Sequence, residues 1–567
     1  MSNNILPDGV VLSVRGLCVD FRLRTHILHA VRDVSFDLRR GATMCLVGES
    51  GSGKSVTARS LLRIIDRPGE ITAGAMLLND GGAAVDISQL APESRAMRDI
   101  RGRRIGLIFQ EPMSSLSPVH TIGAQIIEAI RLHSTRDARA ARALAIELLR
   151  QVEIPEPDKR IDRYTFELSG GMRQRAMISM ALAGNPDVLI ADEPTTALDV
   201  TTQAEILDLI KRLQVSRGMA MLLITHDMGI VAEVADDVTV MRFGKIVEQA
   251  SVDEVFHSPR HPYTKQLLAA TLKLEHGATA RATPPAIAPL LSVRGLTKLY
   301  GGRGRTQAGA LRAVDDVSFD LYPGENLGIV GESGSGKTTL GRLILRVVEP
   351  SAGQVTYRAR DGATVEVTSL SKHGLRGFHR DIRLVFQDPF ASLNPRMTVR
   401  EVIGDPLVVN RLASGQALVD RVASLMTLVG LDPLGMERYP HAFSGGQRQR
   451  IGIARALALD PRVIIADEAT SALDVSIRSQ VLDLLLELRG RLCLSFIFIS
   501  HDISVVRYFC DRVAVMHRGR IVEIGGAEQI CTAPQAAYTR ALISAVPNPD
   551  PREKRMLNRH RFETALP

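Results

Sequence analysis

Two stretches of this chain carry residues whose types and spacing suit phosphate chemistry. VGESGSGK occupies positions 47–54 and recurs unchanged at 330–337. Ser55 and Thr338 follow and complete the pattern G-x-x-x-x-G-K-[ST] in both places. Glycines let the backbone turn its N–H groups around a phosphate, the lysine can reach the β- and γ-phosphates, and the hydroxyl can be offered to Mg²⁺. The sequence therefore predicts two phosphate-binding loops.

Two acids end an apolar run in each half of the chain. VLIADE ends at Glu193, and VIIADE ends at Glu468. Such runs are typical of buried parallel strands, whose carboxyl ends are where doubly wound α/β sheets bind ligands. We expect Asp192 and Asp467 to help hold Mg²⁺, directly or through water, and the two glutamates to polarise an attacking water. Taken in isolation, the acids could equally just end a strand.

A glutamine and a histidine follow two further β-rich runs in each half. Gln110 ends RIGLIFQ and Gln387 ends DIRLVFQ, while His226 ends MLLITH and His501 ends SFIFISH. The glutamine amide can bond the metal or the lytic water, and the histidine can contact the γ-phosphate. A lone glutamine is usually a surface residue and a lone histidine is usually structural. The repeated order of these residues within the set favours the functional interpretation.

The phosphate-binding loops need a strand before them and a helix after them. TMCLV and NLGIV precede the two loops and have the apolar character of buried strands. SVTARSLLRII and TTLGRLILRVV follow and are typical of helices. Each loop therefore stands in the strand–loop–helix context that distinguishes a P-loop from a glycine-rich turn that binds nothing.

The whole set of motifs is duplicated. LSVRGL, SGG, ADE, ALDV and an HD after an apolar run each occur twice, in the same order and at nearly the same separation. The chain is therefore predicted to hold two copies of one domain, at residues 1–262 and 290–546. Residues 263–289 are rich in Ala, Thr and Pro and are expected to form a linker. The Pro-rich, charged tail at 547–567 is expected to be flexible.

Composition narrows the class of protein. With 567 residues, 45% apolar and 23% charged, the chain resembles an ordinary globular protein with several domains. The net charge of +8 permits nucleic-acid or anionic-membrane binding, but a solvated surface is the preferred interpretation. None of the five cysteines is at C-x-x-C spacing, which disfavours zinc sites and disulfide frameworks. The sequence has no apolar run of about 18 residues and no signal-peptide pattern.

A second kind of helix start points to a particular family. LSGGMRQR at 168–175 and FSGGQRQR at 443–450 form another anion-binding helix N-terminus, which a P-loop domain does not need for its own nucleotide. With the motifs above, these residues resemble ABC-type ATPases over nearly all of both copies. The resemblance implies an α/β fold of two tandem P-loop NTPase domains. Each would have a RecA-like, mostly parallel sheet core, an antiparallel β subdomain and a helical signature subdomain.

The resemblance also implies a composite active site. In ABC ATPases two nucleotide-binding domains pair head to tail, so Lys54 would share one ATP with Ser444, and Lys337 would share the other with Ser169. The chain would then be an internal pseudo-dimer. Fusion would supply both halves at a high effective concentration. Every expected catalytic group is present in both copies, so two hydrolysis-competent sites are predicted, with ATP and Mg²⁺ as cofactors.

The remaining ATP contacts follow from the same resemblance. Phe21 and Tyr300 match the position whose ring stacks on adenine. The other assigned residues are the two P-loops and the two signature starts: Gly48, Glu49, Ser50, Gly51, Ser52, Gly53, Lys54, Ser55, Gly331, Glu332, Ser333, Gly334, Ser335, Gly336, Lys337, Thr338, Ser169, Gly170, Gly171, Ser444, Gly445 and Gly446.

Segments outside the ATPase core resemble one branch of the family. EPMSSLSPVHTIGAQI, DPFASLNPRMTVREVI and HSPRHPYTKQLLAA resemble the ATPase subunits of bacterial oligopeptide and dipeptide importers, with APQAAYTRALISAVPNP as a weaker second copy. This implies two integral-membrane permease subunits whose coupling helices dock near Gln110 and Gln387. It also implies an extracytoplasmic substrate-binding protein, and a peripheral location on the cytoplasmic face of the inner membrane.

Two other functions compete with the importer. A soluble ABC protein acting on the ribosome or on nucleic acid would suit the basic charge. However, ribosome-acting relatives carry a long charged helical linker, and repair-type relatives carry zinc modules, and this sequence has neither. No nucleic-acid partner is therefore expected. A P-loop kinase would leave the two signature motifs unexplained.

Overall fold

The computed structural model describes residues 6–81, 83–135, 137–196, 198–275, 288–301, 310–386, 388, 392–471, 473–560 and 562. The chain divides into two compact units. Unit 1 comprises Met1–Ala269 and Ala545–Arg559, and unit 2 comprises Ala270–Ser544 and His560–Pro567. Of the linker expected at 263–289, the first part lies in a helix, and residues 276–287 lie outside the described residues.

Unit 1 is built on two sheets. The six-stranded sheet is parallel except for its β9–β10 edge, and its order is β10 (Lys245–Ser251), β9 (Asp237–Arg242), β3 (Thr43–Val47), β8 (Ala220–Thr225), β7 (Val188–Asp192) and β6 (Ile105–Ile108). The antiparallel sheet has the order β2 (Ile27–Arg39), β1 (Val10–Arg22), β4 (Gly69–Asp80) and β5 (Ala83–Asp86).

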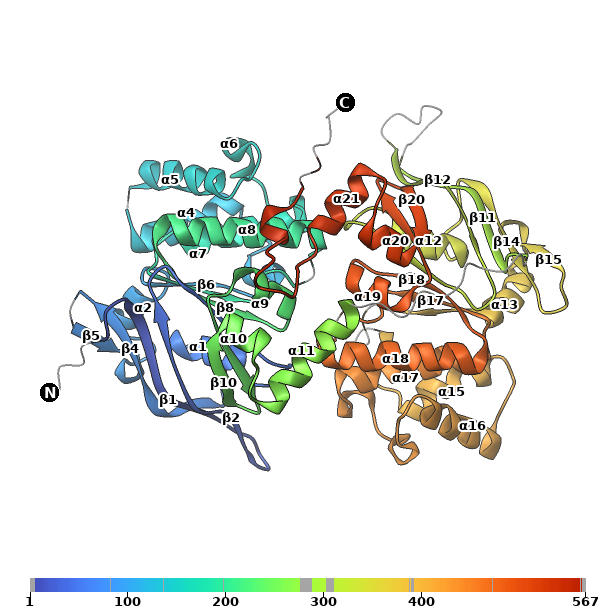
Figure 1. Cartoon of the computed structure of the whole chain (residues 1–567), viewed down its shortest axis with the longest axis horizontal. Helices are drawn as coiled ribbons and strands as arrows, with labels where there is room; N and C mark the ends of the chain where they lie inside the picture. The colour runs from blue at the N-terminus through green and yellow to red at the C-terminus, as the bar shows by residue number, and fades with distance from the viewer. Residues whose placement is uncertain are drawn as a thin grey trace. The chain divides into compact units, whose positions relative to one another are not determined.

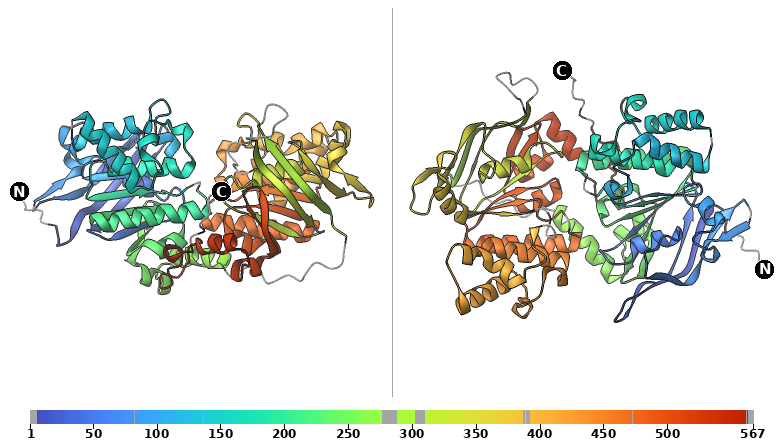
Figure 2. Two further views of the ribbon diagram at one scale, coloured as in Figure 1. Left: turned by 90° about the horizontal axis from the view of Figure 1, so that it is seen from above. Right: turned by 180° about the vertical axis from the view of Figure 1, so that it is seen from behind.

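The helices of unit 1 fall into a covering set and a separate helical group. The helices and 3₁₀ turns are α1 (Lys54–Leu61), η1 (Ile87–Gln89), α2 (Arg95–Ile100), α3 (Pro112–Ser115), α4 (Ile122–His133), α5 (Ala138–Gln151), α6 (Pro157–Arg160), η2 (Thr165–Glu167), α7 (Gly170–Leu182), α8 (Val200–Arg217), α9 (Met228–Val234), α10 (Val252–His257), the first part of α11 (Pro262–Glu275), which unit 2 takes over at Ala270, and η6 (Met556–Asn558). Helices α4 to α6 gather at one end of the unit, opposite the antiparallel sheet (Figures 1 and 2).

Unit 2 repeats this plan. Its six-stranded sheet has the order β16 (Ile382–Val385), β17 (Val463–Asp467), β18 (Ser495–Ile499), β13 (Asn326–Val330), β19 (Arg512–His517) and β20 (Arg520–Gly526). Its antiparallel sheet has the order β12 (Leu311–Leu321), β11 (Leu291–Tyr300), β14 (Ala352–Arg358) and β15 (Thr364–Glu366). The helices and 3₁₀ turns are α12 (Lys337–Ile344), η3 (Val367–Ser369), α13 (Lys372–Asp381), α15 (Val399–Val409), α16 (Gly415–Leu428), η4 (Pro433–Gly435), η5 (Pro440–Ala442), α17 (Gly445–Leu457), α18 (Val475–Leu492), α19 (Ile503–Phe509), α20 (Ala527–Thr532) and α21 (Ala537–Ser544).

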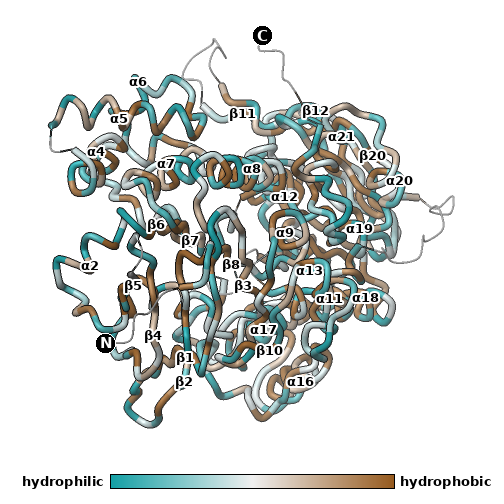
Figure 3. The backbone as a smooth tube through the Cα atoms, turned by 60° about the vertical axis from the view of Figure 1, so that its left-hand side comes forward, coloured by the Kyte–Doolittle hydropathy of each residue, from teal (hydrophilic) through white to brown (hydrophobic). Residues whose placement is uncertain are grey.

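The central strands form because their residues are apolar on both faces. Every residue of β3, β7 and β8 is buried, and the apolar run of β8 is brown in Figure 3. Parallel strands covered by helices on both faces need such continuous apolar runs. Their carboxyl ends share one edge of the sheet, so β3, β7 and β8 deliver the residues that follow them to the same place. The predicted sheet core, antiparallel sheet and helical group are all confirmed.

The end of the chain differs from the flexible tail expected at 547–567. Met556 is fully buried and, with Ala545, belongs to the hydrophobic core that α4, α7 and α8 build in unit 1. Glu233 of α9 is 1% exposed and its Oε1 accepts hydrogen bonds from the backbone N–H groups of Asn548, Arg555 and Met556. One apolar anchor and one buried carboxylate therefore fix a segment whose composition is that of a mobile tail.

Candidate functional site

The loop between β3 and α1 wraps around the ammonium group of Lys54. Lys54 Nζ donates to the carbonyl oxygens of Gly48 at 2.6 Å and Glu49 at 2.9 Å. Gly53, the N-cap of α1, has φ +102°, and a Cβ there would lie 2.5 Å from the carbonyl oxygen of Ala30. Only glycine fits this position. The loop therefore holds its lysine at the amino end of a helix, where an anion is stabilised.

Unit 2 repeats this loop closely. Lys337 Nζ donates to the carbonyl oxygens of Gly331 and Glu332, both at 2.7 Å. Gly336 has φ +103°, and a Cβ there would lie 2.2 Å from the carbonyl oxygen of Ala313. The other predicted loop residues lie between the same strand and helix in each unit: Ser50, Gly51, Ser52, Ser333, Gly334 and Ser335.

The first acid of each ADE motif meets the hydroxyl that follows the lysine. Ser55 Oγ donates to Asp192 Oδ1 at 3.0 Å, and Thr338 Oγ1 donates to Asp467 Oδ1 at 3.2 Å. Burial, and then the negative charge of the adjacent glutamate, raises the pKa of both aspartates. A desolvated carboxylate beside a hydroxyl is the hard oxygen donor set that Mg²⁺ prefers, and a cation would offset the cost of its charge. The residues present therefore fit a magnesium ion.

The second acid, Glu193, joins three predicted or adjacent polar residues into one cluster. Its Oε1 lies 3.0 Å from His226 Nδ1. Its Oε2 accepts hydrogen bonds from Gln110 Nε2 at 2.8 Å and from Thr196 Oγ1 at 3.0 Å. Its backbone adopts the left-handed region at φ +45° and donates to Ile224 O at 3.0 Å. Contacts from the segment of Gln110, from the segment of Ile224 and His226, and from the nearby Thr196 thus fix this residue.

The electrostatics of Glu193 differ from those of its neighbour. Burial alone would raise its pKa, but the hydrogen bond and charge of His226, together with Thr196 and Lys54, outweigh burial and lower the pKa to about 2. The carboxylate is thus ionised at neutral pH, as a group that polarises water must be. Glu468 of unit 2 has its pKa lowered in the same way, with His501 Nδ1 3.2 Å from its Oε2. Gln387 lies outside the described residues.

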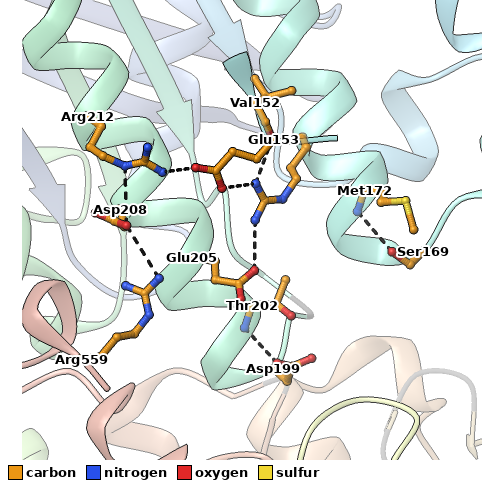
Figure 4. Close-up of polar contacts among 11 residues, drawn as sticks. Val152, Glu153, Ser169, Met172, Asp199, Thr202, Glu205, Asp208, Arg212 and Arg559 are labelled. Atoms are coloured by element: carbon orange, nitrogen blue, oxygen red, sulfur yellow. Dashed lines mark hydrogen bonds and ion pairs between the residues drawn. The ribbon is translucent and has the colours of Figure 1, made fainter. Parts of the chain in front are cut away.

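The signature serines begin the helices of the helical groups. Ser169 Oγ accepts a hydrogen bond from the N–H of Met172 at the start of α7, and Ser444 Oγ accepts one from Gln447 at the start of α17. Gly170, Gly171, Gly445 and Gly446 form the first turns of these helices. Figure 4 shows Ser169 and the neighbouring N-cap at Asp199, which accepts from the N–H of Thr202 at 3.0 Å. Both helix starts therefore have the geometry expected of anion-binding N-termini.

A buried arginine anchors α7 to its surroundings. Arg175 donates to Val152 O at 2.9 Å and forms ion pairs with Glu153 and Glu205, both at 3.0 Å. Glu205 lies on α8, and Glu153 directly follows α5 (Figure 4). The signature helix is thus held by a carbonyl and two carboxylates rather than by packing alone.

The two rings assigned to adenine lie at strand ends in different environments. Phe21 is in β1, partly buried, and packs closely against Gly69. Tyr300 ends β11, is 41% exposed, and has the ammonium of Lys298 5.3 Å from its ring centroid. Tyr300 therefore offers an open ring face.

Two tyrosines that the sequence reasoning missed contact the phosphate-binding loops. Tyr263 Oη accepts a hydrogen bond from the N–H of Glu49 at 3.0 Å, and Tyr538 Oη accepts one from the N–H of Glu332 at 3.2 Å. Both tyrosines are buried and lie in helices beyond the ATPase cores, α11 and α21. The YT dipeptide recurs in HPYTKQ and AAYTRA, and this repetition was the signal that could have revealed them.

A cavity of about 280 Å³ lies beside the cluster in unit 1. Its wall includes Gly106 and Phe109 of the β6 segment, Leu116 after α3, and Met177 and Met180 of α7. The wall is predominantly apolar and reaches to the residue before Gln110. The cavity therefore lies between the β6 segment and the helical group. No helix in the described part of the chain is long and apolar enough to cross a membrane.

Comparisons with known proteins agree with this geometry. A family model described as ABC transporter matches residues 31–196 and 314–471, and a model described as the oligopeptide/dipeptide transporter C-terminal region matches 247–295 and 522–565. The chain is 50% identical to the glutathione import ATP-binding protein GsiA of Salmonella paratyphi A, over 97% of this chain and 92% of that protein. It is 47% identical to GsiA of Pectobacterium atrosepticum, over 96% and 91%.

Among solved structures, a dimeric ATP-binding cassette in a post-hydrolysis state bound to ADP and Pi is 29% identical to this chain. The match covers 42% of this chain and 98% of that one, with a TM-score of 0.37. Two matches to the ABC transporter model, two matches to the importer-specific region and relatives of nearly full length establish the classification. The chain belongs to the ABC transporter family and is an ATP-hydrolysing subunit of the oligopeptide/dipeptide importer type.

Proposed function

We propose that each unit supplies one half of two composite ATP sites. Lys54 with Asp192 and Glu193 would act on an ATP that is also held by Ser444, and Lys337 with its acids would act on an ATP held by Ser169. The observation that carries this proposal is an ionised glutamate beside a histidine, which recurs in both units. A domain that had lost catalysis would not need to keep that geometry.

The residues divide the hydrolysis between them. Each lysine and the adjoining N–H groups neutralise the phosphates, and the glutamate accepts a proton from the attacking water while the histidine holds the carboxylate in place. Mg²⁺, held by Ser55 and Asp192 or by Thr338 and Asp467, would supply charge stabilisation at the β- and γ-phosphates. The side-chain amides of Gln110 and Gln387 would bind the metal or the attacking water.

The free energy of ATP hydrolysis would be transmitted to membrane partners. We place the chain on the cytoplasmic face of the inner membrane, bound to two integral-membrane permease subunits whose helices dock beside Gln110 and Gln387. The apolar cavity next to Gln110 supports such docking. An extracytoplasmic binding protein would present the cargo. The relatives named for glutathione import favour a small peptide such as glutathione as that cargo.

Reconstitution tests this function. The chain is incorporated with the two permease subunits encoded with it into liposomes that hold ATP and Mg²⁺, and uptake of labelled glutathione and of a labelled dipeptide is measured with the cognate binding protein present. We expect ATP-dependent accumulation of one of these. The matched control, Glu193→Gln with Glu468→Gln, should bind ATP but lose turnover by roughly 10²-fold or more. Normal turnover in that control would remove the two glutamates from the catalytic role.

A further inference from the structure

A carboxylate from the edge strand of each six-stranded sheet holds a helix that follows the ATPase core. Glu523 of β20 accepts hydrogen bonds from the backbone N–H groups of the two residues before α21, at 2.8 and 3.0 Å. Glu248 of β10 accepts them from the two residues before α11, at 2.7 and 3.0 Å. An anion is also stabilised by the amino end of a helix. Both helices therefore begin at a fixed place beside the sheet.

This placement brings a tyrosine to the start of each phosphate-binding loop. Tyr538 is the second residue of α21, and its hydroxyl accepts a hydrogen bond from the N–H of Glu332. Tyr263 is the second residue of α11, and its hydroxyl accepts one from the N–H of Glu49. In both units, therefore, a helix outside the ATPase core contacts the loop that is assigned to ATP.

The strand that ends beside Tyr538 contacts the same loop. A Cβ built on Gly331 would lie 2.1 Å from the carbonyl oxygen of Met516, so the strand packs against the start of the loop. The N–H of Gly519, in the turn after the strand, donates to Ser335 O at 3.0 Å. His517 is the last residue of β19 and lies between these two contacts in the sequence. Its backbone is therefore held against the loop.

The side chain of His517 packs on the ring of Tyr538. The two ring centroids are 4.1 Å apart, and the ring planes differ by 22°. Phe562 meets both rings edge-on, with its centroid 5.8 Å from that of His517 and 5.7 Å from that of Tyr538. Burial and the charge of Arg518 lower the pKa of His517, so the imidazole is neutral at neutral pH. These are arrangements that aromatic rings prefer, and they fix the tilt of Tyr538.

Unit 1 supports its tyrosine with a different chemical group. Arg242 ends β9, as His517 ends β19, and its guanidinium carbon lies 4.6 Å from the ring centroid of Tyr263. The N–H of Gly244 donates to Ser52 O at 3.0 Å, which repeats the turn contact of unit 2. A guanidinium stays charged, so a cation–π contact takes the place of the stacked ring. Equivalent positions therefore contact the tyrosine in both units.

We propose that His517 is a positioning residue for ATP binding by unit 2 and acts through the hydroxyl of Tyr538. Arg242 has the same role in unit 1, through Tyr263. The inference rests on the proposed binding of ATP at both phosphate-binding loops. The contact on the ring fixes the direction of the hydroxyl, and a hydrogen bond weakens steeply when its donor and acceptor are misaligned. The helices beyond the two ATPase cores thereby contribute to the ATP affinity of each unit.

ATP titration of the full chain, one loop at a time, tests the inference. The Lys54→Ala background leaves unit 2 with the lysine of its loop. There His517→Ala should bind ATP roughly 3- to 10-fold more weakly, because the hydroxyl of Tyr538 loses its alignment. His517→Phe keeps a stacked ring and should retain the affinity of the background chain. His441→Ala is the matched control: it removes a histidine ring stacked on Tyr439 at 5.7 Å, and it should leave the affinity unchanged.

The reciprocal background shows that the effect belongs to one unit. In Lys337→Ala, unit 1 keeps the lysine of its loop. There His517→Ala should leave ATP affinity within about 2-fold, whereas Arg242→Ala should weaken it roughly 3- to 10-fold. Equal losses from His517→Ala in the two backgrounds would show general damage to the fold and would overturn the inference.

A double-mutant cycle shows whether His517 acts through the tyrosine. Tyr538→Phe keeps the ring but removes the hydroxyl, so it should weaken ATP binding in the Lys54→Ala background, and adding His517→Ala should cause no further loss. A merely structural role of His517 gives losses that add, and that result would overturn the inference, as would unchanged affinity in His517→Ala. A Lys54→Ala chain that binds no ATP would overturn the proposed role of the unit 2 loop, and the inference with it.

Discussion

At the scale of single residues, the two glutamates proposed for catalysis have partly different neighbours in the described residues of the two units. Glu193 has Gln110, Thr196 and His226 around it, whereas the hydroxyl of Ser471 donates to the backbone oxygen of Glu468 rather than to its carboxylate. The contact between glutamate and histidine is present in both units.

The hydroxyl of Tyr263 gives a first prediction. Tyr263→Phe keeps the ring, which the guanidinium of Arg242 contacts at 4.6 Å, but it removes the acceptor for the N–H of Glu49. Leaving that N–H without its partner costs about 1 kcal/mol, so we expect ATP affinity to fall by roughly 3- to 10-fold, measured by nucleotide titration. Tyr322→Phe, in unit 2, is the matched control and should bind ATP normally. Equal ATP affinity in the two variants would show that the hydroxyl of Tyr263 does not contribute to ATP binding by the loop.

The pKa of Glu193 gives a second prediction. Because the folded protein lowers that pKa from 4.5 to about 2, the ionised carboxylate contributes stability above pH 4.5 and loses it as the pH falls towards 2. Glu193→Gln has no such titration. The difference in unfolding free energy between parent and variant should therefore be on the order of 3 kcal/mol above pH 4.5 and shrink in more acidic solution. Urea unfolding across a pH series measures it, and parallel curves would contradict the assignment.

At the scale of elements, a buried arginine ties the signature helix to its neighbours. Arg175 joins α7 to Glu205 of α8 and to the residues that follow α5. Helix propensity alone would not orient a 13-residue helix whose first turn is two glycines. This arginine therefore acts together with the buried apolar residues of α7 to fix the position of Ser169.

Replacing this arginine gives a third prediction. Arg175→Met keeps much of the length of the side chain but leaves Val152 O and Glu205 without their cationic donor, whereas Glu153 keeps its ion pair with Arg212. The carboxylates are half-exposed, so we expect a loss of about 1–3 kcal/mol in the stability of unit 1 and faster hydrogen exchange in α7. Arg142→Met breaks an exposed pair with Asp162 and should cost less than about 1 kcal/mol. Similar losses of stability in the two variants would show that the ion pairs of Arg175 contribute no more than an exposed surface pair.

The elements also show how much of the structure could be predicted from the sequence. The strand–loop–helix context placed Lys54 correctly, and the apolar run before Asp192 gave a buried strand, because both signals are local. The tie between Tyr263 and Glu49 could not be predicted, because it joins a helix beyond the ATPase core to the loop.

At the scale of the whole molecule, the chain is not divided where its composition changes. Residues 545–559 belong to unit 1 although the rest of the second repeat forms unit 2. Charge and proline content predicted a mobile tail, but Met556 and Leu557 form an apolar pair within it that packs on the core of unit 1. Two side chains thus outweighed the composition of the whole segment.

This packing gives a fourth prediction. Met556 is fully buried, so Met556→Ala should cost about 2–4 kcal/mol in the stability of unit 1 and speed hydrogen exchange in α8 and α9. Leu132→Ala, at a side chain of unit 1 that is 72% exposed, should change stability by about 0.5 kcal/mol or less. Exchange that is faster only in unit 2 would contradict the assignment of this segment to unit 1.

Residues 545–559 are thus needed by a unit whose other residues, 1–269, are translated well before them. While the chain is being synthesised, residues 1–269 leave the exit tunnel with an incomplete interior, because Ala545 and Met556 have not yet been added. The carboxylate of Glu233 also lacks, until then, the three backbone N–H groups that donate hydrogen bonds to it. Final consolidation of unit 1 therefore waits until residues 545–559 have been synthesised, and a product stopped before residue 545 would carry a permanent defect in a unit whose residues 1–269 are all present.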